Sequence, residues 1–487
     1  MPNLIHQTKK QLSKMERGQV LMVVAISLVG LIAIIGIALD VGVMFIENAR
    51  LRRAVDSAAL AAALQFRQGY TADNLDRSAQ EFLALNGIHD PNALVQVCMD
   101  PAPAPSDPDY IHYNAALCTV PPRKLVKVVA SGTAYLAFLP VIGINSAPIV
   151  AEAISETASV EVVLVLDRSD SMTWGADVGD PMRDPSVCNG GTSGDGYVGD
   201  CHPFDEVKRA AVSFVNQLYF PYDSVSVVSF DKDAAVLMTF SNDQAAIINT
   251  IKNLRVYQGE VSVADPFGDN AIYPNGDPSR WYDPSHVYYG LDCPQTDEAN
   301  HILFPGKYPV GNYSPAACTT TNIGAGLRLA GAQFIGEPPQ SLWVVILLTD
   351  GVANAGYLID GSGNAEYFCP STTWSNFDIP PKCNDGDSST RHIQGFPVDP
   401  FNPDYDAEDY AYDSADYIAG QHALLFTIGL GDKVIQTSTV DNTALGEKFL
   451  QYAATKGDGF YTFAPNATQL NEIFRQIAEN IATRLAH

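Results

Sequence analysis

Five oxygen-bearing side chains lie at three separate points of the sequence: Asp167, Ser169, Ser171, Thr321 and Asp350. The first three form the motif DRSDS directly after one apolar run, and the last follows a second apolar run. Two carboxylates and three hydroxyls offer only oxygen ligands, which hard divalent cations such as Mg²⁺ prefer. With so few carboxylates, an open coordination position could accept a carboxylate from another molecule. These residues therefore predict a metal site that recognises an acidic group.

The segments that carry these residues alternate between strand-like and helix-like patterns. Val160–Leu166 (VEVVLVL) and Leu342–Leu348 (LWVVILL) are apolar runs typical of strands covered on both faces. The alternation predicts an α/β fold with a doubly wound, mostly parallel sheet, in which ligands bind at the carboxyl ends of strands where the strand order reverses. Further strands are expected at 225–230, 236–240, 423–428 and 460–463, and helices at 204–218, 244–254, 324–334, 407–422, 446–456 and around 470–481.

Together, the three pieces resemble the metal-ion-dependent adhesion site of a von Willebrand factor A domain. The stretches TNIGAGLRLA, VVILLTDGVAN and LLFTIGLG are similar to that family as well. The resemblance covers 159–487 and implies a Rossmann-like fold, with Mg²⁺ held by the five residues named above and Mn²⁺ or Ca²⁺ as substitutes. It also implies a protein ligand that supplies a carboxylate to the metal. The alternative, a DRSDS motif that only caps the next turn, leaves the other two pieces unexplained.

Three insertions interrupt this domain, at 172–203, 256–320 and 352–404, and we expect them to project from the rim that carries the metal. They contain six of the eight cysteines and three of the four tryptophans. Their aromatic residues predict a binding surface, unless the rings pack inside the insertions themselves. Their acidic clusters predict a solvated acidic surface, with structural Ca²⁺ as the alternative.

The N-terminal region contains a candidate membrane helix. Val20–Leu39 is a stretch of about 20 residues without a charge, long enough to cross a bilayer. The Ala-rich segment that follows predicts a continuation of this helix, so that 19–67 is helical. Four cations before the run against three after it favour a cytoplasmic 1–18: Lys9, Lys10, Lys14 and Arg17 precede it, and Arg50, Arg52 and Arg53 follow. A cleaved signal peptide is the alternative, but the run is longer than usual for such a peptide and the nearest small-residue stretch, 58–63, lies far downstream.

This region resembles Tad/Flp pilus-assembly proteins of the TadE and TadG type. The resemblance rests on RGQ before the apolar run, LDVG at its end and AVDSAALA beyond it, and the C-terminal FAPNATQLNEIFRQIAENIATRL is also similar to TadG-like chains. It implies pilin-like partners and a single-pass protein of the bacterial cytoplasmic membrane with an extracytoplasmic C-terminal domain. Gly18-Gln19 is also similar to a prepilin cleavage point, but Val23 stands where pilin-like sequences usually carry Glu, so processing is left open.

Between these parts, 68–158 predicts a membrane-proximal α+β spacer. It should contain a polar helix at 72–86, a strand at 125–130, an apolar helix near 135–142 and a strand near 149–155.

All eight cysteines follow the apolar run, and none forms a CxxC or Cys/His pattern. An even set in loop-like sequence predicts disulfides in an oxidising compartment. The pairs expected are 98–118, 188–201, 293–318 and 369–383, and the alternative is that some of these thiols are free and buried.

The net charge of −26 excludes nucleic-acid binding as a main role. No GxSxG, phosphate loop or nucleophile with a base is found, so we expect no enzyme, and a metal hydrolase ranks far behind. Two compatible hypotheses follow. The first is a membrane-anchored, metal-dependent adhesin-like protein of a Tad/Flp-type pilus. The second is a structural pilus-assembly or minor pilin-like component whose A domain acts as tip or anchor.

Overall fold

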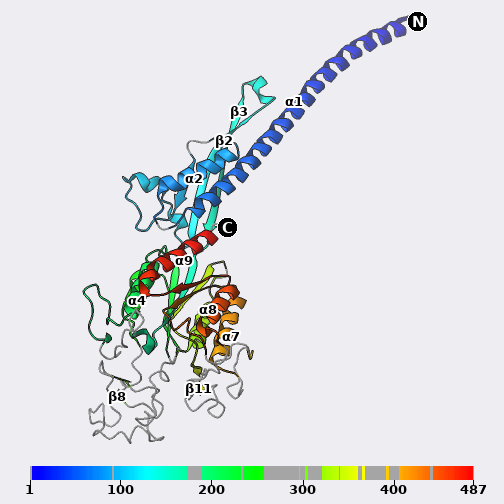
Figure 1. Cartoon of the computed structure of the whole chain (residues 1–487). Coiled ribbons are helices and arrows are strands. Elements are labelled where there is room, and N and C mark those ends of the chain that lie inside the picture. The colour runs from blue at the N-terminus through cyan, green and yellow to red at the C-terminus, as the bar shows by residue number, and fades with distance from the viewer. Residues whose placement is uncertain are drawn as a thin grey trace. The chain divides into compact units, whose positions relative to one another are not determined.

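The computed structural model (Figure 1) describes residues 3–67, 69–89, 93–173, 188–231, 234–256, 295–296, 302–304, 321–338, 340–359, 365–367, 391–393, 405–438 and 442–485. The chain divides into two compact units, Met1–Thr157 and Ala158–His487, each with its own contacts.

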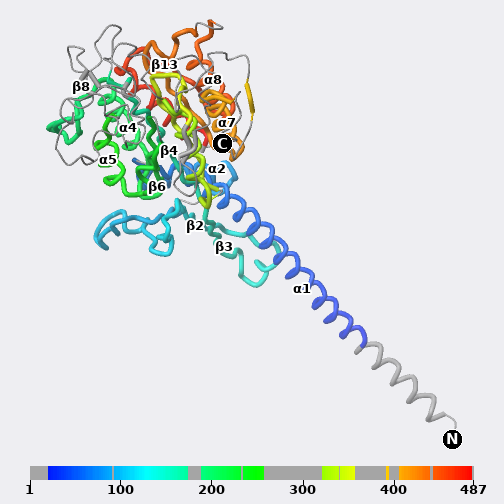
Figure 2. The backbone as a smooth tube through the Cα atoms, turned by 90° about the horizontal axis from the view of Figure 1, so that it is seen from below, coloured from blue at the N-terminus to red at the C-terminus, as the bar shows by residue number. Residues whose placement is uncertain are grey.

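The first unit is built on one long helix, α1 (Asn3–Leu64). Its apolar part is exposed, and α1 is long and apolar enough from Val20 onward to cross a membrane. Figure 2 shows this N-terminal part extending away from the other elements of the unit. The Ala-rich part is buried instead: Ala54, Ala58 and Ala62 are fully covered because α1 packs on a small sheet and on α2 (Ala72–Leu85).

The small sheet is antiparallel, with strand order β1 (Leu94–Val97), β2 (Lys124–Tyr135) and β3 (Ser146–Thr157). β1 was not expected from the sequence. The expected helix near Tyr135–Ile142 is wrong: Tyr135 ends β2 and pairs with Ser146, and only the 3-10 turn η3 (Leu139–Ile142) follows. An apolar run does not by itself distinguish helix from strand, and here the pairing of β2 with β3 decides. Two further 3-10 turns are η1 (Pro108–His112) and η2 (Ala115–Leu117).

The second unit is built on a six-stranded sheet with the order β13-β12-β9-β4-β5-β6. All neighbours are parallel except β5 and β6, which are antiparallel. The chain passes from the central strand β4 to β5 on one side and returns later to β9 on the other. The strand order therefore reverses between β4 and β9, which is where α/β sheets bind ligands. The strands are β4 (Val160–Asp167), β5 (Ser224–Phe230), β6 (Ala234–Ser241), β9 (Leu342–Thr349), β12 (Leu424–Leu430) and β13 (Tyr461–Ala464).

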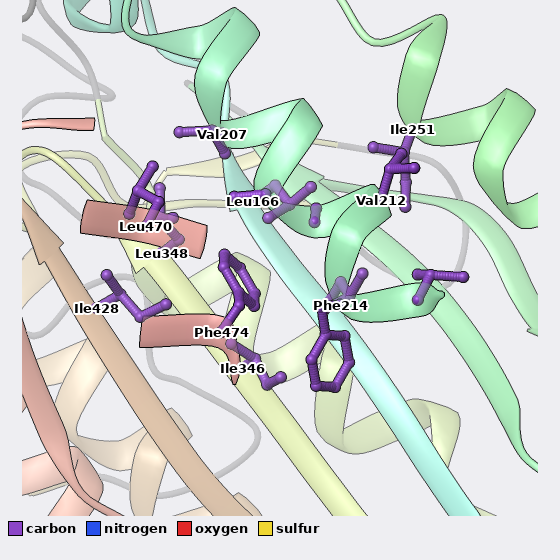
Figure 3. Close-up of a cluster of buried hydrophobic side chains, with 14 of the residues drawn as sticks. Leu166, Val207, Val212, Phe214, Ile251, Ile346, Leu348, Ile428, Leu470 and Phe474 are labelled. Atoms are coloured by element: carbon purple, nitrogen blue, oxygen red, sulfur yellow. The ribbon is translucent and has the colours of Figure 1, made fainter. Parts of the chain in front are cut away.

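Helices cover both faces of this sheet. One face packs against α4 (Phe204–Val215), α5 (Gln244–Lys252) and α9 (Leu470–Leu485), and the other against α6 (Ile323–Gln333), α7 (Ala407–Gly420) and α8 (Leu445–Lys456). In Figure 3, Leu166 and Leu348 lie on neighbouring strands in the same cluster as Phe214 and Phe474, whose rings are 5.7 Å apart. The buried strands β4 and β9 are thus fixed from both sides. The remaining elements are η4 (Asp170–Thr173), β7 (Gln295–Thr296), β8 (Ile302–Phe304), β10 (Tyr357–Ile359), β11 (Ala365–Tyr367) and η9 (Ala467–Gln469).

Two of the four expected disulfides, Cys98–Cys118 and Cys188–Cys201, are confirmed. The other two, 293–318 and 369–383, lie outside the described residues. The described end of the first insertion, 188–203, packs against the face of the sheet that α4, α5 and α9 cover, since Cys188, Tyr197 and Cys201 belong to the hydrophobic cluster on that face.

One acidic cluster differs from its expected solvated state. Asp406, Glu408 and Asp409 are buried at the start of α7, where Asp406 accepts hydrogen bonds from the backbone N–H groups of Glu408 and Asp409. Asp406 and Asp409 form a capping box, so helix capping explains the acidity at these two positions. The clusters at 177–184 and 385–387 lie outside the described residues.

Candidate metal centre

Asp167 ends the central strand β4, and its carboxylate is held by the backbone and by the neighbouring strand. One oxygen, Oδ1, accepts the N–H of Ser169 at 2.9 Å, and the other, Oδ2, accepts the hydroxyl of Thr349 at 2.6 Å. Thr349 lies on β9, which pairs with β4 up to Leu166 and Leu348. Asp167 is completely buried. Parallel pairing of the two strands therefore places this carboxylate at the point where the strand order reverses.

The two serines connect Asp167 to the second carboxylate. Ser171 Oγ donates to Asp350 Oδ1 at 2.7 Å, and Ser169 Oγ lies 2.9 Å from Ser171 Oγ. The two serine hydroxyls are therefore within hydrogen-bond distance of each other, and either can be the donor. Both serines and Asp350 are buried. Four of the five expected residues thus form one continuous polar network across β4 and β9.

Thr321, the fifth residue, lies beside the peptide that follows Asp350. Its Oγ1 is 3.4 Å from the position that a Cβ atom on Gly351 would occupy. A pair of hydrogen bonds fixes its backbone: Thr321 N–H donates to Asn354 Oδ1 at 2.7 Å, and Asn354 N–H donates to Thr321 O at 3.1 Å. Asn322 caps the N-terminus of α6 by accepting the N–H of Ala325. The start of α6 therefore brings Thr321 to the carboxyl ends of β4 and β9, where the other four residues lie.

The electrostatics of the site are those of two carboxylates in a dry environment. Burial, with a further contribution from the negative charge of Asp350, raises the pKa of Asp167 to about 7. Burial also raises the pKa of Asp350, while the positive charge of Lys433 lowers it in part. A raised pKa means that the fold disfavours the charged carboxylates in the absence of a cation.

The donor set fits a hard divalent cation. In the described part of the chain, no group of three or more His, Cys, Asp or Glu residues is arranged to hold a metal ion. The residues gathered here instead combine two carboxylates with hydroxyls, and such oxygen ligands suit Mg²⁺ with water in its shell. A cation between the carboxylates would also relieve the cost of burying their charges.

Residues that the sequence reasoning did not single out support the site. Asp231 follows β5, is buried, and forms an ion pair with Arg168 at 2.6 Å. Its backbone carbonyl accepts the N–H of Asn322 at 2.7 Å, which ties the start of α6 to the end of β5. Asn354 lies in the quoted stretch VVILLTDGVAN, but only its contact with Thr321 shows what it does. Lys433, whose positive charge acts on Asp350, follows the buried strand β12. This position after a buried strand is the sequence signal by which it could have been found.

Comparison with known families matches two parts of the chain. Residues 162–268 match the model of the von Willebrand factor type A domain, and residues 18–65 match that of Flp pilus-assembly TadE/G-like proteins. The chain joins a TadE/G-like segment to a von Willebrand factor A domain. The first match contains Asp167, Ser169 and Ser171 but ends before Thr321 and Asp350, so only the fold unites all five residues. No curated protein matches the chain.

Several solved structures are similar to the A-domain fold. The vWF domain of the type V pili tip protein Mfa5 from Porphyromonas gingivalis shares 15% identity at a TM-score of 0.36, covering 68% of this chain and 97% of that one. The PilB minor pilin from Streptococcus sanguinis shares 17% at 0.35, covering 74% and 75%. A conserved hypothetical protein, BatB, from Bacteroides thetaiotaomicron shares 14% at 0.31, covering 67% and 99%.

Proposed function

We propose that this protein is a membrane-anchored, extracytoplasmic binding protein of a Tad/Flp-type pilus, and that its A domain binds an acidic group of a partner protein through a divalent cation. The observation that carries the proposal is the network of Asp167, Ser169, Ser171 and Asp350 at the reversal of strand order, with Thr321 beside it. The TadE/G-like match and the apolar helix support the anchoring.

In this proposal the five residues hold the cation through carboxylate and hydroxyl oxygens. Bound Mg²⁺ would supply a positive charge at the carboxyl ends of the central strands, and this ion can take a further oxygen ligand. The hydrogen bond from Thr349 to Asp167 keeps one carboxylate oriented before the cation arrives. The proposed cation is Mg²⁺, with Mn²⁺ or Ca²⁺ as substitutes.

The test uses the full-length protein in detergent, immobilised and exposed to pilus components with Mg²⁺ or with EDTA. We expect partners to be retained with Mg²⁺ and lost with EDTA. Asp167→Asn should abolish this retention, because the amide removes one of two anionic ligands. Asp458→Asn is a matched control, because Asp458 is 86% exposed and follows α8, at the opposite ends of the strands. Equal retention by both variants would reject metal-dependent binding.

A structural role in pilus assembly is the second candidate, favoured by the TadE/G-like match at 18–65. The small residues Ala54, Ala58 and Ala62 are covered by the protein's own sheet, so the exposed apolar part of α1 is what remains for helix partners. If this role is the main one, pilin-like proteins should co-purify with the Asp167→Asn variant as well as with the wild type. A metal hydrolase would require activity that EDTA removes.

A further inference from the structure

The loop between β2 and β3 is apolar and exposed. Residues 128–151 contain no Asp, Glu, Lys or Arg, in a chain with 55 acidic and 29 basic residues. At the tip, Val141 is 89% exposed and Ile142 is 71% exposed, and Phe138 and Ile144 are exposed beside them. Soluble surfaces rarely present such clustered apolar side chains to water, and clusters of this kind mark interaction sites.

This loop is attached to the apolar part of α1. A Cβ atom on Gly36 would lie only 3.0 Å from the Cβ of Phe138, so the loop packs closely on the helix at that point. Asp40, one turn further along, accepts the backbone N–H groups of Ala137 (2.6 Å), Phe138 (3.1 Å) and Leu139 (2.7 Å). Figures 1 and 2 both show the β2–β3 hairpin running alongside α1.

The contact fixes the depth of the loop relative to the candidate membrane segment. Gly36 lies three residues before Leu39, the last residue of the uncharged run, which corresponds to about 5 Å along the helix. Apolar groups of proteins that lie in the membrane interface are buried to a depth of about 5–10 Å. A loop docked at Gly36 is thus level with the edge of the hydrocarbon region.

Asp40 satisfies backbone N–H groups of the non-helical loop at this depth. Backbone N–H groups in a bilayer must be hydrogen-bonded within the protein, because no water is present to accept from them. The Asp40 carboxylate accepts three consecutive N–H groups of the loop and is itself fully covered. The loop can therefore enter the leaflet without unsatisfied donors at 137–139.

We propose that the β2–β3 loop, residues 138–144, inserts its apolar side chains into the membrane leaflet that α1 leaves toward the folded units. The ligand of this surface is the acyl chains and glycerol region of phospholipids, and the loop acts as a second anchor beside the helix. The inference rests on the proposed membrane anchoring of α1. A second copy of the chain or a pilin-like helix is the competing occupant, and the test separates these from lipid.

The experiment uses full-length protein in vesicles of phosphatidylethanolamine and phosphatidylglycerol. The photo-reactive residue p-benzoylphenylalanine replaces one residue at a time, and cross-linked products are identified by mass spectrometry. Val141 reports on the loop, and Ile34 reports on the anchoring helix. Val120 is the matched control: it is 98% exposed in the same unit, near the opposite end of β2, which spans about 40 Å.

We expect phospholipid adducts at Ile34 and Val141 and none at Val120. Phospholipid adducts at Ile34 together with protein adducts, or none, at Val141 would overturn the loop proposal and leave the anchoring intact. Adducts at Val120 equal to those at Val141 would also overturn it, because they show no selection by depth. Failure of Ile34 to react with lipid would reject the anchoring and the loop insertion together.

Discussion

At the scale of residues, the candidate metal centre is a balance between burial and charge. Asp167 and Asp350 are both buried, and hydrogen bonds from Thr349, Ser169 and Ser171 only partly replace the water that they lose. The sequence motif predicts which residues take part. It does not predict that Ser169 and Ser171 connect the two carboxylates through one backbone N–H and two hydroxyls, because that connection depends on the register between β4 and β9.

The raised pKa of Asp167 leads to a prediction about pH. The pKa of Asp167 is 3.8 in its usual state and about 7 in the metal-free folded protein. Between these two pH values, the folded protein keeps a proton that the unfolded chain has released. As pH rises from about 4 to 7, the contribution of Asp167 to the free energy of unfolding therefore falls, by at most about 1.4 kcal/mol per pH unit. Above that range this contribution no longer changes with pH. Urea unfolding in EDTA at several pH values measures this change.

Glu161 titrates in the same pH range, because burial and the charge of Glu337 raise its pKa to about 7. The Asp167→Asn variant keeps Glu161 and therefore separates the two effects. The difference in free energy of unfolding between the wild type and this variant should fall as pH rises. Added Mg²⁺ should stabilise the wild type more at pH 8 than at pH 5, because a metal ligand must release its proton. A Mg²⁺ effect that is the same at both values would contradict this assignment.

At the scale of elements, the position of Thr321 depends on how closely α6 approaches α7. Gly324 makes this approach feasible: a Cβ atom there would lie 2.3 Å from Cδ1 of the buried Tyr410. The sequence stretch TNIGAGLRLA contains this glycine but does not show which ring it faces. The helix pattern was predictable from local sequence, whereas the helix-to-helix distance is set by side chains that are far apart along the chain.

We expect Gly324→Ala to destabilise the second unit by about 1–3 kcal/mol through overpacking, although alanine favours helix. The shifted start of α6 should also weaken Mg²⁺ binding. Urea unfolding and Mg²⁺ titration measure the two effects. Gly194→Ala is the matched control, because nothing lies within 4 Å of the added methyl group and the change should stay within about 0.5 kcal/mol. A Gly324→Ala protein as stable as this control would show that the helices do not pack as described.

At the scale of the whole molecule, the two units each bury apolar residues of their own, such as Ala58 and Val126 in the first and Leu164 in the second, and they have different candidate roles. The first unit carries the exposed apolar helix and the disulfide Cys98–Cys118, and the second carries the candidate metal centre and the disulfide Cys188–Cys201. A ligand that binds only one of the two folded units stabilises that unit alone, unless the units unfold together.

We therefore expect two thermal transitions for the full-length protein in detergent. Mg²⁺ at about 100 times its Kd should stabilise only the second unit, by about 2.7 kcal/mol. Differential scanning calorimetry with Mg²⁺ or EDTA measures this, with the Asp167→Asn variant as the control that should not respond. A single transition that shifts as a whole would show that the units unfold cooperatively.

The elements with strong local patterns could be predicted from the sequence alone. They are the apolar helix, the buried strands β4 and β9, and the stripe of Leu470, Ile473, Phe474, Ile477 and Ile481 on α9, which is buried as expected. The sequence also named the five candidate ligands, because their residue types and their positions after strands are local properties. Two features became evident only in the folded chain: the loop after Tyr135 is held by Asp40, and Asn354 holds Thr321 in place. The physical reason is that these contacts join segments distant in sequence, so their free energy appears only when packing brings both partners together.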